Sequence, residues 1–356
     1  MNLIERKQAF ILLGKCLNNY CAGKRYEMDT IAGFGAFEQL NKAVRQAYAD
    51  NNWFIEPNVL MAVKVVANNM LDAMKLNDWL AKYPDLPDNT NVNKRIGIIM
   101  AGNIPLVGFH DLLCVLLCGY MAVIKTSSKD NVLIHAVIDL LCKIEPRFRG
   151  LICYVNERPA DIDMIISTGS NNSARYFKSW YGSIPHIIRK NRSSVAILTG
   201  NETESDLKLL GKDIFSYFGL GCRNVSTLFV PDNYDFDLLL SALSDYLPIF
   251  EHRGYNDCFR YQKAIMEMES LPYHNTGFLL MRNSVSLSAP IALVNYQKYS
   301  ILDEVKIIIN TLYNEIQCIV YQHNDVPNTI KFGQTQFPQL DDYADGVDTL
   351  KFLIDN

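Results

Sequence analysis

The sequence predicts an α/β protein in which a Rossmann-type parallel sheet follows an N-terminal helical segment and precedes a second α/β domain. From residue 94 onward, short β-rich runs alternate with helical patterns, which is typical of βαβ units. Hydrophobic residues make up 49% of the chain and charged residues 20%, as in a folded protein with a large core. We therefore divide the chain into residues 1–93, 94–192, 193–325 and a tail, 326–356.

The first segment is predicted to be helical and to pack on the domain that follows it. Apolar residues recur at intervals of three and four over 4–20, 37–51 and 57–83. A polar linker rich in proline and turn-forming residues occupies 84–91. We find no candidate catalytic residue in this segment.

The second segment is predicted to form a parallel sheet that binds a dinucleotide. Strands are expected over 96–100, 121–125, 150–155 and 163–168, with helices over about 105–118 and 132–143. Sheets of this kind bind nucleotides beyond the carboxyl ends of their strands. The G-x-G-x-x-G fingerprint is absent after the first strand, so the prediction depends on the other strand ends.

Three strand ends carry candidate binding residues. Asn103 follows the first strand in a G-N-I-P sequence, and it is either a functional side chain or the N-cap of a helix that begins at Pro105. Lys125 ends the second strand and precedes the hydroxyl residues 126–128. Residues 168–170, Thr-Gly-Ser, lead into a helix whose N-terminus suits a phosphate, although a simple helix cap has the same pattern.

The third segment is predicted to present a nucleophile. A helix runs into Gly219 and Gly221, which bracket Leu220, and Cys222 follows immediately before a strand over 225–230. The glycines permit backbone angles that other residues resist, and they leave space beside the thiol. The alternative is a packed cysteine, since cysteine is among the most buried residue types.

The rest of this segment continues the α/β alternation. We expect strands over 193–200, 278–281, 290–294 and 316–322, and helices over 235–247 and 301–313. The acidic and aromatic tail is interpreted as a packed end, an oligomer contact or a rim of the substrate cleft.

Composition excludes several classes of protein. With 34 basic and 38 acidic residues the net charge is −4, and no basic run is present, so we expect no nucleic-acid partner. No apolar stretch reaches 18 residues, so we expect no membrane span, and the charged N-terminus does not read as a signal peptide. Nine cysteines without C-x-x-C spacing favour the reducing cytoplasm and no metal cluster.

The motifs, in their order along the chain, resemble the aldehyde dehydrogenase superfamily. They are a strand followed by G-N-I-P, a strand that ends in lysine, a Thr-Gly-Ser turn, and a G-x-x-C sequence roughly fifty residues later. The G-N-I-P-L sequence, the K-T-S-S run at 125–128 and the short chain resemble more narrowly the LuxC family of acyl-CoA reductases. The resemblance covers roughly residues 94–325 and implies an aldehyde-dehydrogenase-like fold.

The resemblance also implies residue roles. Cys222 would be the nucleophile, and the Asn103 side chain would stabilise the oxyanion together with the backbone amide of Cys222. Lys125, with Ser127 and Ser128, would lie near the adenosine ribose of the cofactor. Thr168, Gly169 and Ser170 would lie beside the pyrophosphate and the nicotinamide ribose. A homo-oligomer is expected by the same analogy.

Departures from the superfamily pattern narrow the expected reaction. The stretch 186–192 aligns with the segment that carries the water-activating glutamate, but it contains no carboxylate. Exchange of the acyl group with a thiol such as coenzyme A is then favoured over hydrolysis. A second family glutamate is also absent from the aligned residues 286–290. At 125–128 the K-P-x-E pattern of NAD-preferring members is replaced by K-T-S-S, so we expect NADPH as the donor, with NADH as the alternative.

We therefore predict an enzyme that reduces a fatty acyl thioester, on coenzyme A or an acyl carrier protein, to the aldehyde through an acyl-Cys222 intermediate. The alternatives are an acyl-phosphate reductase and an acyl-transfer component that uses the same cysteine. A helix dipole ending before Cys222 would raise the pKa of its thiol, and Arg223 is a candidate to offset that effect. His110 either faces the cleft or is a satisfied helix histidine, and the second interpretation is favoured.

Overall fold

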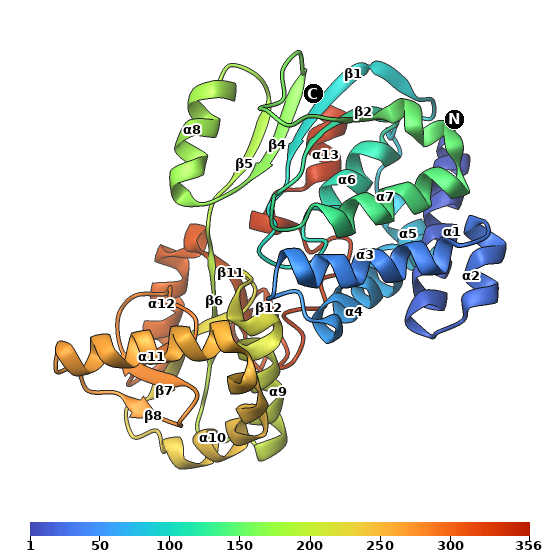
Figure 1. Cartoon of the computed structure of the whole chain (residues 1–356). Coiled ribbons are helices and arrows are strands. Elements are labelled where there is room, and N and C mark those ends of the chain that lie inside the picture. The colour runs from blue at the N-terminus through green and yellow to red at the C-terminus, as the bar shows by residue number, and fades with distance from the viewer. The chain divides into compact units, whose positions relative to one another are not determined.

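Two sheets organise the chain in a computed structural model that describes residues 1–356 (Figure 1). Each sheet belongs to its own unit. The first unit comprises Met1–Lys190 and Pro338–Asn356, and the second comprises Asn191–Phe337. The last 19 residues of the sequence therefore belong with the N-terminal unit, whereas residues 326–337 belong with the second.

The first unit begins with helices, as its periodicity predicts. They are α1 (Leu3–Cys21), α2 (Arg25–Ala32), α3 (Ala36–Asp50), α4 (Glu56–Val65), the π-helix η1 (Val66–Met70) and α5 (Ala73–Leu80). Asn2 and Glu5 form a capping box at the start of α1. The buried Arg6 donates hydrogen bonds to the carbonyls of Met1, Pro87, Asp88 and Leu117. These bonds attach α1 to the polar linker and to Leu117 at the end of a later helix, α6 (Phe109–Leu117).

The sheet of this unit is entirely parallel, with the order β3-β2-β1-β4-β5. Its strands are β1 (Asn91–Ile99), β2 (Tyr120–Lys125), β3 (Ile152–Tyr154), β4 (Met164–Thr168) and β5 (His186–Arg189). The connections contain α6 (Phe109–Leu117), α7 (Val132–Ile144), the 3₁₀ helix η2 (Pro146–Leu151) and α8 (Asn171–Tyr181). The strand order reverses at β1, which creates a switch point between β1 and β4.

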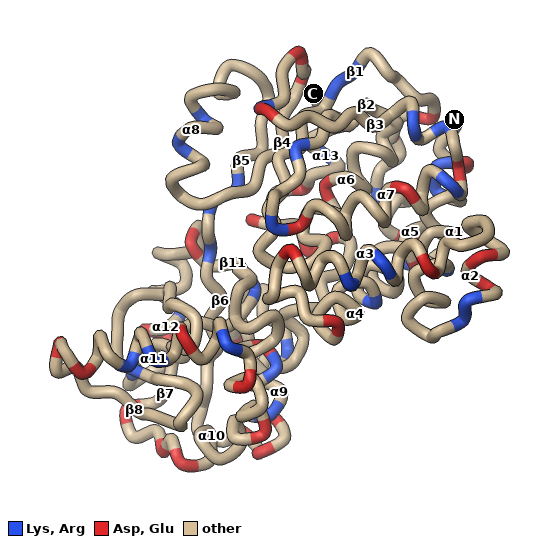
Figure 2. Tube along the Cα trace, in the orientation of Figure 1, with Lys and Arg blue, Asp and Glu red and all other residues tan.

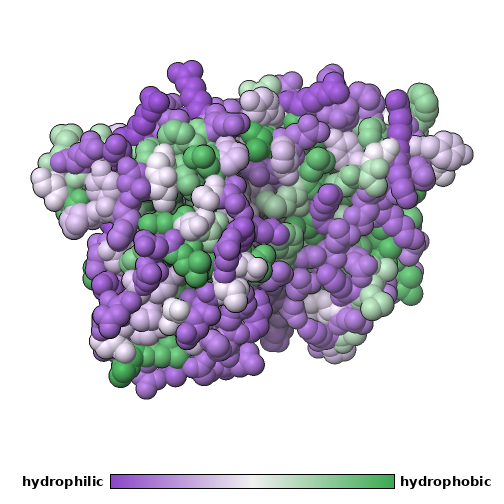
Figure 3. Space-filling model, turned by 90° about the horizontal axis from the view of Figure 1, so that it is seen from below, coloured by the Kyte–Doolittle hydropathy of each residue, from purple (hydrophilic) through white to green (hydrophobic).

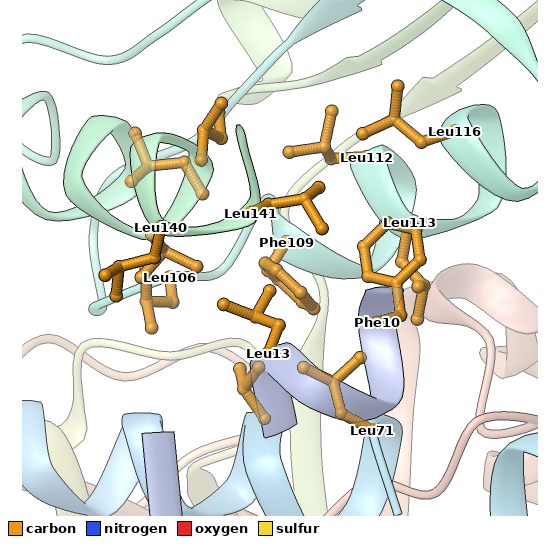
Figure 4. Packing of buried hydrophobic residues seen from close by; sticks show 14 of the residues in the cluster. Phe10, Leu13, Leu71, Leu106, Phe109, Leu112, Leu113, Leu116, Leu140 and Leu141 are labelled. Atoms are coloured by element: carbon orange, nitrogen blue, oxygen red, sulfur yellow. The ribbon is translucent and has the colours of Figure 1, made fainter. Parts of the chain in front are cut away.

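The core of the first unit joins the N-terminal helices to the helices that cover the sheet (Figure 4). Phe10 and Leu13 of α1 pack with Phe109 and Leu113 of α6 and Leu141 of α7, all fully buried or nearly so. The amphipathic stripe of each helix is buried against the others, and this burial makes the helical segment part of one core.

The C-terminal helix α13 (Thr349–Asp355) packs on α6 and adds Leu350 and Leu353 to the same core. A buried ion pair lies close by, in which the guanidinium of Arg189 donates to Asp111 at 2.5 Å and to the hydroxyl of Thr349 at 2.9 Å. The tail thus contributes to the core of the first unit.

The second unit contains a seven-stranded sheet with the order β12-β11-β6-β7-β10-β9-β8, antiparallel only at the β8 edge. Its strands are β6 (Ser193–Ile197), β7 (Val225–Pro231), β8 (His274–Asn275), β9 (Leu280–Asn283), β10 (Leu293–Tyr299), β11 (Ile316–Val320) and β12 (Thr329–Ile330). Its helices are α9 (Glu204–Phe215), α10 (Phe236–Leu243), α11 (Arg253–Met268) and α12 (Leu302–Thr311).

Several predicted boundaries in both units are wrong. The helix expected from Pro105 begins at Phe109, because Leu106 adopts a left-handed φ of 59°. The strand expected over 290–294 begins at Leu293, because Ala292 has a φ of 65°. The helix expected over 235–247 gives way after Leu243 to the 3₁₀ helix η4 (Ser244–Glu251), which contains Pro248. The helix α11 was not predicted from the sequence.

The charged residues of both signs are interspersed along most elements (Figure 2). On the face drawn in Figure 3, hydrophilic residues cover most of the surface and hydrophobic residues form separate patches. No helix combines the length and the apolar character that a membrane crossing requires.

Candidate functional site

Three of the predicted binding segments meet at the carboxyl edge of the first sheet. Ile99 of β1 pairs with Lys125 of β2 on one side and with Ser167 of β4 on the other. The residues that follow each strand, 101–108, 126–130 and 169–170, therefore emerge side by side. They flank the β1/β4 switch point, where sheets of this topology bind their ligands.

Asn103 lies in a bend of the loop between β1 and α6, half-buried. The N-cap of α6 is Gly108, so the interpretation of Asn103 as the cap of this helix is wrong. A hydrogen bond attaches this loop to the segment that follows β2. The amide of Leu106 donates to a carboxylate oxygen of the buried Asp130 at 2.7 Å. Burial raises the pKa of Asp130 to about 6.

Gly102 lies close against the turn after β2. A Cβ atom at residue 102 would lie 2.5 Å from the hydroxyl of Ser127 and 2.6 Å from its Cβ. Any side chain would therefore push the two strand ends apart. The glycine of the G-N-I-P sequence has a packing role that the sequence alone does not indicate.

Two hydroxyl groups of the turn after β2 form hydrogen bonds with other residues close to them in the chain. Thr126 donates to the Asn131 side chain at 2.8 Å, and the hydroxyl of Ser127 accepts from the amide of Lys129 at 3.2 Å. Lys125 is half-buried, whereas Ser128 and Lys129 are exposed. The exposed polar groups at the tip of this turn are thus Ser128 and Lys129.

At the third strand end, the Thr-Gly-Ser segment forms a helix cap. The hydroxyl of Ser170 accepts from the amide of Ser173 at 3.1 Å, which caps α8. A Cβ at Gly169 would lie 2.9 Å from Ser173 and 3.0 Å from the Phe177 ring, so strand and helix meet closely. The remaining amides of the first turn of α8 have no intrahelical acceptor, and such a terminus fits the pyrophosphate of a dinucleotide.

Cys222 belongs to the second unit and sits on a tight turn before β7. Residues 221–224 form a β-turn closed by the amide of Asn224, which donates to the carbonyl of Gly221 at 3.0 Å. Cys222 and Arg223 occupy its two central positions. Cys222 is the one exposed cysteine of nine, and none forms a disulfide, so the alternative of a packed core cysteine is wrong.

The segment between α9 and this turn is strained. Tyr217 and Phe218 adopt left-handed φ angles of 52° and 60°, and Gly219 follows with 78°. Left-handed backbone is rare for bulky residues, and each instance costs on the order of 1–3 kcal/mol. Both aromatic side chains are nevertheless buried, at 5% and 6% exposure, which supplies the compensating packing.

Asn224, which was not predicted from the sequence as a site residue, connects the turn to the end of α9. Its side-chain NH₂ lies within hydrogen-bond distance of the carbonyls of Asp213 (3.1 Å), Ile214 (3.2 Å) and Ser216 (2.8 Å). Its side-chain oxygen accepts from the amide of Gly221 at 2.9 Å. The last carbonyls of α9 are therefore occupied, which weakens the dipole effect expected at the thiol.

Arg223 has a structural partner on another loop. Its Nε donates to the carbonyl of Thr335 at 2.6 Å. The same loop is held by the buried Asp213, which accepts from the amides of Gly333 and Thr335 and from the Thr335 hydroxyl. Burial raises the pKa of Asp213 to about 6. Arg223 thus helps to attach residues 333–335 to the cysteine turn.

His110 lies in the first unit, where its ring packs against Trp79 and Tyr343. Its Nε2 is 2.9 Å from the carbonyl oxygen of Leu340 in the tail. Burial lowers the pKa of His110. These contacts are those of a satisfied helix histidine that holds the C-terminal tail.

A small cavity of about 30 Å³ adjoins the cysteine turn within the second unit. Gly219, Asn224 and Val225 contribute to it on the side of the turn. The other lining residues are Ile214, Phe215, Phe218, Ser226, Tyr255, Leu279, Ala289, Pro290, Ile291, Ala292, Leu293 and Val294. Most of the residues that line it have apolar side chains.

The candidate residues are therefore distributed between the two units. Asn103, Lys125, Ser127, Ser128 and residues 168–170 belong to the first, where they share one edge of the sheet. Cys222, Asn224 and the cavity belong to the second.

Comparison with known proteins identifies the fold. No family model and no curated protein matches the sequence. Among solved structures, one similar protein is aldehyde dehydrogenase 21 from Physcomitrella patens in complex with the reaction product succinate. It superposes with a TM-score of 0.65 at 12% identity, and the superposition covers 100% of this chain and 84% of the Physcomitrella chain.

Two bacterial structures give the same result. A putative aldehyde dehydrogenase from Burkholderia cenocepacia has a TM-score of 0.64 at 12% identity, with 91% of this chain and 75% of its own covered. The aldehyde dehydrogenase of Mycobacterium tuberculosis complexed with NAD⁺ has a TM-score of 0.60 at 14% identity, with 94% and 76% covered. The predicted aldehyde-dehydrogenase-like fold, with its N-terminal helical segment, is confirmed.

Proposed function

We propose that the protein reduces an acyl thioester, carried on coenzyme A or an acyl carrier protein, to an aldehyde through a covalent intermediate on Cys222. The observation that carries the proposal is the placement of Cys222, which is exposed at the centre of a hydrogen-bonded turn. Exposure permits attack, and the hydrogen bonds of Asn224 hold the turn that carries the thiol.

The first chemical step uses groups of this chain. The thiolate of Cys222, whose proton has passed to solvent, attacks the acyl carbonyl and forms the new C–S bond. The bond to the carrier sulfur then breaks, and the carrier leaves as a thiolate that takes a proton from solvent. The backbone amide of Cys222 is one proposed donor to the oxyanion, and the resemblance of the G-N-I-P sequence to the superfamily pattern makes the side chain of Asn103 the second proposed donor. Loss of one such donor typically lowers kcat by about 10²–10³-fold.

The second step needs a reduced nicotinamide dinucleotide, which supplies a hydride to the acyl carbon when it is bound. The thiohemiacetal on Cys222 then releases the aldehyde and regenerates the thiolate. The edge of the first sheet fits this cofactor, since it combines a switch point, a close approach at Gly102 and a helix N-terminus at Ser170.

Water is not the proposed acceptor of the acyl group. The segment 186–192 has no carboxylate, and its Arg189 is buried in the ion pair with Asp111. The next carboxylate along the chain, Glu202, accepts from the amides of Thr199 and Gly200 and from the Thr199 hydroxyl. Without a base to activate water, the acyl-enzyme persists until it is reduced or returned to a thiol.

NADPH is the proposed donor. The Mycobacterium tuberculosis structure contains NAD⁺, which supports a nicotinamide cofactor for this fold. The turn after β2 has no carboxylate between Lys125 and Lys129 to oppose a 2′-phosphate, and it exposes Ser128 and Lys129.

The test is intact-protein mass spectrometry after mixing with an acyl-CoA, with and without NADPH. We expect one acyl adduct on the native protein, none on Cys222→Ala, and an unchanged adduct on the matched control Cys258→Ala, a half-buried cysteine of the same unit. NADPH should discharge the adduct with loss of its absorbance. An adduct that NADPH leaves intact would favour acyl transfer, and adduct formation only with acyl phosphate would favour an acyl-phosphate reductase.

A further inference from the structure

We propose that Asp130 is a positioning residue for Asn103, because its carboxylate fixes the loop after β1 that carries the proposed oxyanion donor. Asp130 would act through this loop and not on the substrate itself. The inference rests on the proposed reductase function and adds to it a residue that determines how well the oxyanion is stabilised.

Two hydrogen bonds to the segment at the end of β2 bracket Asn103. The amide of Met100, three residues before Asn103, donates to the carbonyl of Lys125 at 3.0 Å and extends the pairing of β1 with β2. The amide of Leu106, three residues after Asn103, donates to Oδ2 of Asp130 at 2.7 Å. The first of these bonds joins two backbone groups, whereas the second depends on a side chain. The end of the loop that follows Asn103 is therefore held by Asp130.

Leu106 needs this hydrogen bond to keep its conformation. Its φ of 59° is left-handed, which is unfavourable for a residue with a bulky side chain and persists only where the surroundings hold it. The Leu106 side chain is 4% exposed and belongs to the core of the first unit (Figure 4). Its bond to Asp130 is buried, so loss of the carboxylate would leave the Leu106 amide without an acceptor.

Asp130 is itself fixed in the structure, as a positioning residue must be. It is 6% exposed, and its amide donates to the carbonyl of Ser127 at 3.2 Å. The adjacent Lys129 is attached to the N-terminal helices, since the side chain of Asn51 donates to its carbonyl at 3.2 Å. The second carboxylate oxygen of Asp130, Oδ1, has no hydrogen-bond partner, so Oδ2 alone makes the contact with Leu106.

The charge of Asp130 strengthens this contact. Burial raises the pKa of Asp130 to about 6, while the amides of Leu106 and Ile134 lower it. The carboxyl group is therefore mainly ionised at neutral pH, and a hydrogen bond to an ionised acceptor is about twice as strong as one to a neutral acceptor. Asparagine at residue 130 would keep a weaker acceptor, and alanine would keep none.

The experiment measures two reactions of Cys222 in the absence of NADPH. Acylation by hexanoyl-CoA or dodecanoyl-CoA, whichever acylates the native protein faster, is followed by intact mass. Alkylation by iodoacetamide, located by peptide mapping, forms no oxyanion. We expect Asp130→Ala to slow acylation by about 10-fold and Asp130→Asn by about 3-fold, with alkylation of Cys222 unchanged in both.

A double-mutant cycle tests whether Asp130 acts through Asn103. Asn103→Ala alone should slow acylation by about 10²–10³-fold. Addition of Asp130→Ala to Asn103→Ala should slow it no further, because the group that Asp130 positions is already absent. A matched control is Asp29→Ala, which removes a half-buried carboxylate that accepts from the amides of Gly35 (3.2 Å) and Phe37 (2.9 Å) in the same unit. This variant should be acylated at the native rate.

The inference is overturned if both Asp130 variants are acylated at the native rate, or if their alkylation falls as much as their acylation. It is also overturned if Asn103→Ala has no effect, or if Asp130→Ala slows acylation equally with and without Asn103. In each of these cases the acyl adduct on the native protein still supports the reductase. If no acyl-CoA acylates Cys222, the proposed function fails and the inference fails with it.

Discussion

Replacement of Asn224 should loosen the cysteine turn more than any other single change of a residue beside it. The side chain is 4% exposed and bonds at both ends, through its NH₂ group to three carbonyls of the α9 terminus and through its oxygen to the amide of Gly221. Asn224→Ala removes all of these bonds. Asn224→Asp keeps the acceptor but places a carboxylate against three carbonyl oxygens.

The magnitude follows from the number of bonds. The NH₂ group has two hydrogens, so its three acceptors share two strong bonds, and the bond from Gly221 adds a third. At about 1 kcal/mol net for each bond, the three bonds of Asn224 contribute about 3 kcal/mol. Because Asn224→Ala also leaves buried groups unpaired, it should lower the free energy of unfolding by at least that amount. Asn224→Asp should lose more at pH 8 than at pH 5, because burial and the carbonyls raise the pKa of the new carboxyl group and ionisation is then unfavourable.

The assay must separate the two units. The three tryptophans, Trp53, Trp79 and Trp180, all lie in the first unit, so their fluorescence in urea reports that unit. The buried Cys318 lies in β11 of the second unit, and its alkylation, located by peptide mapping, reports the unfolding of that unit. We expect alkylation of Cys318 to begin at a lower urea concentration in both variants than in the native protein. Without urea, the alkylation rate of Cys222 in both variants should also differ from its rate in the native protein.

A matched control is Ser216→Ala, which removes a side-chain bond to the carbonyl of Lys212 at the same helix end but leaves the bonds of Asn224 in place. It should shift the Cys318 transition by much less than Asn224→Ala does. If Asn224→Ala and Asn224→Asp unfold as the native protein does and Cys222 reacts at its native rate, the positioning role of Asn224 is refuted.

Two further predictions concern the first sheet edge and the loop beside the cysteine turn. Gly102→Ala should weaken NADPH binding by about 10-fold in a fluorescence titration, because its Cβ would lie 2.5 Å from the Ser127 hydroxyl. The control Gly150→Ala, at a glycine with open space around it, should bind NADPH with the native affinity. Equal affinities of the two variants would contradict the packing role of Gly102. Burial raises the pKa of Asp213 from its ordinary value of 3.8 to about 6. This group therefore makes the native protein lose up to about 3 kcal/mol of unfolding free energy as pH rises from about 4 to 6. Asp213→Asn should remove that part of the pH dependence in urea unfolding followed by circular dichroism, and an unchanged slope would show that another group is responsible.

Much of the fold follows from local pattern. Continuous apolar runs predicted most strands of both sheets, and three-to-four periodicity predicted the N-terminal helices. The candidate cofactor segments were found because parallel strands end at one edge, so Lys125 and Thr168 had to lie on either side of the loop after β1. The glycines before Cys222 indicated a presented thiol, and the cysteine is exposed.

Other features depended on contacts between residues far apart in the sequence. Leu106 and Ala292 take left-handed angles because surrounding contacts hold them, for example the bond from the Leu106 amide to Asp130, and these angles moved the start of α6 and of β10. Asn224 has no signal in its own neighbourhood, since its acceptors are 8 to 11 residues away on a helix that must first form.

The sequence by itself determined the alternation of strands and helices, the shared edge of the first sheet and the identity of the candidate nucleophile, because each depends on side-chain periodicity or on residues adjacent in the chain. Tertiary structure decided which hydrogen bonds hold the cysteine turn, where the tail packs and that the hydroxyl of Tyr255 is buried without a hydrogen-bond partner. Burial and hydrogen-bond satisfaction are properties of packing between distant segments, and no local pattern encodes them.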